Sequence, residues 1–104
     1  MNIEHWEKIC QRDGFQPIGK SDIGKCELFV AERQCPPAMG DENPFKRQTY
    51  FEVLWAIYPD QIARRVALPA MWFPVQAQRI KAVCRIAGQW VKDRKQVRAS
   101  HGLH

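Results

Sequence analysis

The chain has 104 residues, of which 45% are apolar and 26% are charged, and its formal net charge is +5 at pH 7. This length provides enough apolar material for one globular domain, residues 1–104, with a single core. No stretch approaches the roughly 20 apolar residues of a membrane-spanning helix, and the first residues lack the charged-then-apolar pattern of a secretory signal. We therefore expect a cytoplasmic protein whose cysteines are free thiols.

The charged residues are divided unevenly between the two halves of the chain. Residues 1–45 contain five Lys and Arg against eight Asp and Glu, a balance of −3. Residues 46–104 contain eleven against three, a balance of +8. Such an asymmetric field favours an anionic partner, and it directs the search for a binding site to the basic half.

The acidic half begins with a predicted helix, Ile3 to Arg12, in which apolar residues recur at helical spacing and which Gly14 can end. The glycines and the proline that follow exclude a further helix. A β-hairpin is predicted there, with strands over Phe15–Ile18 and Lys25–Ala31 and a turn around Gly19–Asp22.

The segment 34–46 is predicted to be a loop, because it contains three prolines and one glycine. A loop of this length is either a surface crossing without further role or a secondary contact surface for a partner.

The next segment is interpreted as helical. Thr49 and Glu52 have the spacing of a capping box, and the apolar run after them fits a buried helix that Pro59 ends. A second short helix is predicted from Asp60 to Ala67. Its pattern resembles the first half of a DNA-binding helix-turn-helix, whose recognition helix would begin at Pro74; the alternative is an ordinary pair of helices.

The dominant predicted element is a long amphipathic helix, Val75 to Val97. Its apolar residues form one stripe at helical spacing. Four cations share a narrow sector opposite that stripe, along about 25 Å of helix. We call them the cationic ridge: Lys81, Arg85, Lys92 and Lys95. Such residues are either a solvated helix face or an anchor for phosphates, and Arg64 and Arg65 in the preceding segment would add to that anchor.

Met71, Trp72 and Phe73 form an apolar group between two prolines. Either they fill the core beneath the last helix, or Trp72 and Phe73 are exposed. In the second case they are an anchor for a protein partner or a platform on which a nucleobase stacks.

The sequence shows no catalytic or metal-binding signature. The cysteines and histidines lack the paired spacing of a zinc site, and no nucleophile motif, acid–base pair or phosphate loop is present. We therefore expect no enzyme activity, no cofactor and no metal.

These observations predict an α+β fold: an N-terminal helix and a β-hairpin, followed by a mainly helical, basic C-terminal half that ends in one long amphipathic helix. The predicted function is non-catalytic nucleic-acid binding through the basic helix face, with DNA as the favoured ligand. The alternative is a small modulator or inhibitor that docks on an acidic protein surface of a nucleoprotein complex.

Overall fold

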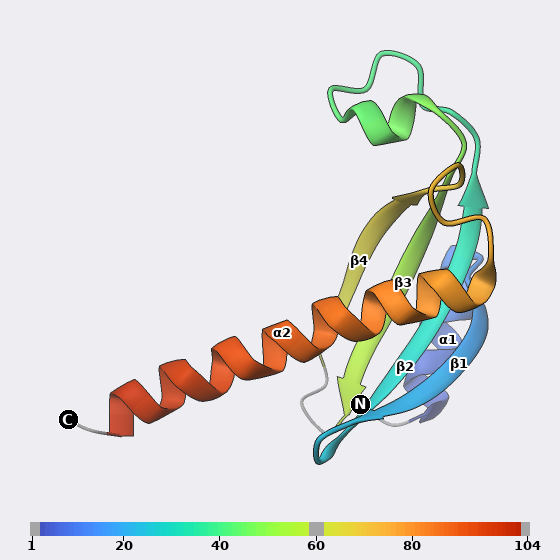
Figure 1. The fold of residues 1–104 in the computed structure, drawn as a ribbon. Coiled ribbons are helices and arrows are strands. Elements are labelled where there is room, and N and C mark those ends of the chain that lie inside the picture. The colour runs from blue at the N-terminus through green and yellow to red at the C-terminus, as the bar shows by residue number, and fades with distance from the viewer. Residues whose placement is uncertain (1–2, 59–61, 103–104) are drawn as a thin grey trace.

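The computed structural model describes the backbone of residues 3–58 and 62–102, and the side chains of residues 4–58 and 63–94. Two helices flank a four-stranded antiparallel sheet with the strand order β1-β2-β3-β4 (Figure 1). In chain order, the elements are α1 (Ile3–Asp13), β1 (Gln16–Ile23), β2 (Cys26–Cys35), the 3-10 helix η1 (Pro44–Arg47), β3 (Tyr50–Tyr58), β4 (Ile62–Pro69) and α2 (Gln76–Gly102).

The prediction of a mainly helical C-terminal half is wrong, because both segments interpreted as helices there are strands. β3 pairs along its length with β2 on one side and with β4 on the other. It is therefore a central strand, and both of its faces are covered: Val53 and Ile57 contribute to one core cluster, and Leu54 and Ala56 to the other. A strand buried on both faces reads as a continuous apolar run, which periodicity alone does not distinguish from a buried helix.

The capping box is likewise wrong, because Glu52 lies within β3 and no helix begins after Thr49. The Thr49 carbonyl accepts a hydrogen bond from the Ala70 amide at 3.0 Å, across the end of the β3–β4 pair. The Glu52 carboxylate accepts from the guanidinium groups of Arg33 and Arg65.

The N-terminal helix and hairpin are present as predicted, but the turn of the hairpin is not where the sequence placed it. Helix α1 ends at Asp13, directly before Gly14 with its positive φ of 75°. The predicted hairpin is β1 and β2, although its strands are longer than expected. The turn lies at Gly24, where φ is 60°, rather than around residues 19–22. Glycine reaches this left-handed conformation without the steric cost of a Cβ atom.

Each face of the sheet carries its own core cluster. On one face, Val83, Ala87 and Val91 of α2 pack against apolar side chains of the strands. On the other, Trp6 and Cys10 of α1 pack with Phe15 and the inward residues of β2 and β3. Helix α2 crosses its face and continues past the edge of the sheet (Figure 1). Its 27 residues correspond to about 40 Å, roughly twice the width of four strands. On the part of α2 whose side chains are described, Lys81, Arg85 and Lys92 on the side away from the sheet are exposed.

Candidate functional site

The cationic ridge lies on the outer face of α2, as its sequence spacing predicts. Lys81, Arg85 and Lys92 are exposed, whereas Val83 and Ala87 on the opposite side of the helix are completely buried. Lys95 belongs to the same helix, but its side chain lies outside the described residues. The described part of the ridge thus offers its charged groups to solvent.

Within the described side chains, the three ridge cations make no ion pair. Ion pairs between described side chains involve cations outside the ridge, among them Arg12, Lys20, Arg33, Arg65 and Arg79. Asp93 is the one acid of α2, and its carboxylate accepts a hydrogen bond from Gln89 at 2.8 Å. The ridge therefore keeps a positive charge that no carboxylate in the described structure neutralises.

The turn after β4 brings two aromatic rings beside the ridge. The amides of Trp72 and Phe73 both donate to the Pro69 carbonyl, at 3.2 and 3.0 Å, so the chain reverses tightly at this point. Phe73 packs partly against the core beneath α2. Trp72 is 65% exposed and Met71 is 76% exposed. The core-filling alternative thus holds for Phe73 alone, and Trp72 is left open to solvent.

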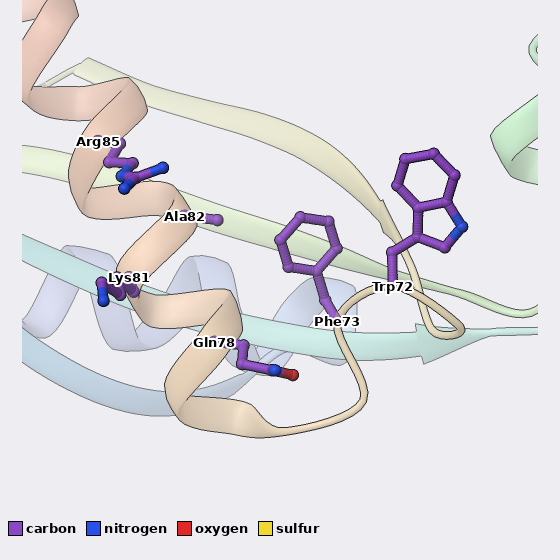
Figure 2. Close-up of a pocket in the computed structure, with 6 residues that line it drawn as sticks. All are labelled: Trp72, Phe73, Gln78, Lys81, Ala82 and Arg85. Atoms are coloured by element: carbon purple, nitrogen blue, oxygen red, sulfur yellow. The ribbon is translucent and has the colours of Figure 1, made fainter.

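Trp72, Phe73 and the ridge meet in one surface hollow of about 250 Å³. Figure 2 shows the Phe73 ring between the helix and Trp72, with the Ala82 methyl group and the Arg85 side chain extending toward it. We call this feature the Trp72 hollow; its lining residues are Trp72, Phe73, Gln78, Lys81, Ala82 and Arg85. It combines a flat aromatic surface, an amide and two cations, which is the chemistry of a site for a base and its phosphates.

Arg85 also lines a second, more apolar hollow farther along α2, together with Ile86 and Trp90. The Arg64 guanidinium reaches this region from β4 and lies 5.6 Å from the centre of the Trp90 ring. Arg64 is exposed and makes no ion pair within the described part of the chain. The structure therefore brings Arg64 beside the ridge, although the two are far apart in the sequence.

Arg65 does not join the ridge, because successive residues of a strand point to opposite faces of the sheet. Its guanidinium pairs with Asp13 at 2.6 Å and with Glu52 at 3.2 Å, on the α1 side. The guanidinium groups of Arg12 and Arg65 lower the pKa of Asp13 below its ordinary value. Arg65 thus links β4 to the end of α1 and to β3.

Arg79 is the residue of this region that the sequence interpretation missed. It lies at the start of α2 with its side chain buried, and its guanidinium binds both carboxylate oxygens of Glu32 on β2. A third hydrogen bond, of 2.7 Å, reaches the Phe73 carbonyl. The same group lies 3.6 Å from the centre of the Phe51 ring. Arg79 therefore fastens both α2 and the aromatic turn to the sheet. The only feature of the sequence that could have indicated this role is the position of Arg79 on the predicted helix, outside the sector of the ridge.

The segment 34–46 contacts Trp72 through one aromatic residue, although it does not line the hollow itself. Its chain is held by a hydrogen bond from the Ala38 amide to the Lys46 carbonyl at 2.6 Å, and Asn43 caps η1 through the Phe45 amide. The Phe45 ring meets the Trp72 ring edge-to-face, with 6.1 Å between the ring centres. The loop thus supports the exposed indole from the side.

The helix-turn-helix prediction is wrong, because its first helix would span β4. Asp60 and Gln61, at the start of that motif, lie outside the described residues, and Ile62–Pro69 form a strand. The segment is a strand, a turn and a helix. That order leaves no first helix to pack against a recognition helix.

The four cysteines were predicted to be free thiols. All four are unbridged, and burial is the main cause that raises the pKa of the Cys10 thiol, which opposes the reactive thiolate form. Among the described residues, no three His, Cys, Asp or Glu side chains gather closely enough to hold a metal ion.

Comparison with known proteins identifies no relative: no protein-family model, curated protein or solved structure matches this chain. Over the described residues, neither helix is both long enough and apolar enough to cross a membrane.

Proposed function

We propose that the protein is a non-catalytic nucleic-acid-binding module that holds a phosphate backbone along the outer face of α2. One observation carries the proposal: exposed cations of the ridge, Lys81 and Arg85, line the same hollow as the exposed Trp72 ring. The cations supply charge for phosphates, and the ring supplies an aromatic surface for bases.

The charge of this face supports an anionic polymer over a small anion. Along α2, Lys81 and Lys92 are eleven positions apart, which corresponds to about 17 Å at 1.5 Å per residue. Arg64 lies beside this line, near Trp90. Cations spread over such a length match a chain of repeated charges better than one compact anion, and each contact with the chain releases a condensed counterion.

A triple variant tests the proposal: Lys81→Gln, Arg85→Gln and Lys92→Gln together. All three side chains are exposed and outside the core, so each change should alter the free energy of unfolding by no more than about 0.5 kcal/mol. Fluorescence anisotropy with a labelled oligonucleotide, over a series of salt concentrations, measures binding. The variant should lose most of the affinity, and the slope of log K against log salt should fall by about 2 to 3.

The matched control removes three exposed cations elsewhere: Lys8→Gln, Lys25→Gln and Arg47→Gln. It has the same net charge as the ridge variant, so it separates a local contact from a general loss of attraction. Equal weakening in both variants would contradict a site on α2. Failure of the wild-type protein to bind any oligonucleotide at low salt would contradict the proposed function itself.

A protein partner with an acidic surface is the second candidate function. It is favoured by the exposed apolar side chains beside the ridge, Met71 at 76% and Ile86 at 40%, which a phosphate backbone does not need. Binding through these side chains should depend much less on salt than binding to nucleic acid, because apolar contacts release no counterions. The same salt series therefore distinguishes the two candidates.

A further inference from the structure

We infer that the ligand of the α2 face is single-stranded, and that one of its unpaired bases stacks on Trp72. This inference rests on the proposed function, and it names the form of nucleic acid that the Trp72 hollow accepts. Its argument depends on the exposure of the indole, on the rigidity of the turn that carries it, and on the chemistry beside it.

The Trp72 indole is exposed although its surroundings are ordered. Its backbone is held by the hydrogen bond to Pro69, and the Phe73 carbonyl next to it is bound by the buried Arg79. Phe45 contacts the ring edge-to-face, and 65% of the residue nevertheless remains accessible. A large ring held in this way loses little conformational entropy when a second flat ring covers it.

A double helix does not offer the surface that this ring needs. In a duplex, the faces of the bases are stacked on one another, and only their edges are accessible in the grooves. Stacking on an indole requires an unpaired base, as in the proteins that bind single strands through aromatic side chains beside a basic groove. Lys81 and Arg85 stand one turn apart on the helix that borders the hollow, where they can contact the phosphates next to the stacked base (Figure 2).

The nucleic-acid strand can continue from the Trp72 hollow along α2. The second hollow adjoins the first at Arg85, and there Arg64 lies beside the Trp90 ring. Lys81 and Lys92 are about 17 Å apart along the helix axis, so a strand lying on this face can contact more than one phosphate. We therefore assign a site that begins at Trp72 and follows the ridge.

Three probes of equal length test the inference in one anisotropy experiment at fixed low salt: a single-stranded oligothymidylate, the same sequence as a duplex, and a single strand of abasic sites. The abasic strand keeps the phosphates and lacks the bases. We expect the oligothymidylate to bind about 10-fold tighter than either other probe. Trp72→Ala should weaken its binding about 10-fold and leave the other two unchanged.

Two further variants control this result. Trp72→Phe keeps a stacking ring and should retain most of the affinity, whereas Met71→Ala, at an exposed side chain of the same turn, should change nothing. A duplex that binds as tightly as the single strand, or a Trp72→Ala variant that weakens all three probes equally, would overturn the inference and leave the proposed function intact. Absence of binding to all three probes would instead overturn the proposed function.

Discussion

The α1 face of the sheet and the outer side of α2 surround their cations differently. On the α1 face, Arg33 and Arg65 share the Glu52 carboxylate, and Arg65 also binds Asp13. On the outer side of α2, Lys81, Arg85 and Lys92 make no ion pair within the described structure. Arg64 and Arg65 adjoin in the sequence and yet belong to the two different environments. The number of basic residues therefore exceeds the number of cations that a partner can contact, because some of the cations form ion pairs between elements of the fold.

The cation that is most strongly committed to the fold is Arg79, and its replacement should have the largest effect. Arg79→Met leaves the Glu32 carboxylate, which is mostly buried, without its partner, so we expect a loss of about 3 kcal/mol in the free energy of unfolding. Urea denaturation followed by tryptophan fluorescence measures this loss.

The double variant Arg79→Met with Glu32→Leu tests the cause of that loss. Removing both charges also removes the unpaired carboxylate, so the double variant should be more stable than the single one. If both variants lose the same stability, Arg79 acts by packing against Phe51 rather than by pairing with Glu32.

Arg64 and Arg65 are adjacent on β4, and they give the sharpest test of the difference between the α2 side and the α1 face. Arg64→Gln and Arg65→Gln change the net charge equally. Arg65→Gln should cost about 1 kcal/mol of stability, a modest value because its side chain is 43% exposed, and should leave nucleic-acid binding unchanged. Arg64→Gln should change stability by only about 0.5 kcal/mol and should lower the salt slope of binding by about 1. The reverse ranking would show that the ligand lies on the α1 face.

The smallest expected effect is a pH dependence at Asp13. Arg12 and Arg65 lower its pKa from the ordinary 3.8, so its ion pairs stabilise the folded state above that value, and the stabilisation is lost as the pH falls through the lower, folded-state pKa. The stability difference between wild type and Asp13→Asn should therefore be largest near neutral pH and should shrink in acid. Urea titrations from pH 7 downward check this, with Asp22→Asn on β1 as the control at an exposed carboxylate.

The sequence by itself determined the elements whose signal is local. The long helix was predicted over Val75–Val97 and lies at Gln76–Gly102. Within its described side chains, the apolar stripe is buried at Val83, Ala87 and Val91, and the ridge cations at 81, 85 and 92 are exposed, as expected. Helical spacing fixes which residues share a face, and a one-sided apolar stripe fixes which face is buried. The N-terminal helix and the β1–β2 hairpin also have local signals, because Gly14 follows the helix and strand-type residues fill β2. The turn of the hairpin was misplaced, since Gly19 lies inside β1 and Gly24 forms the turn.

Only the tertiary structure decided the identity of β3 and β4 and, through them, the site. A central strand covered on both faces loses the alternation that identifies strands, so Val53 to Ile57 could not be distinguished from a helix by pattern. Because β4 is a strand, its successive side chains point to opposite faces of the sheet, so Arg64 lies on the α2 side and Arg65 on the α1 side. The turn after β4 then brings Trp72 to the ridge, and the partners of Arg79, 47 positions away on β2 and at Phe73, hold it there. Contacts between residues so distant in the chain leave no local pattern. The sequence therefore predicted the ridge and the exposed Trp72 separately, but not that they lie side by side.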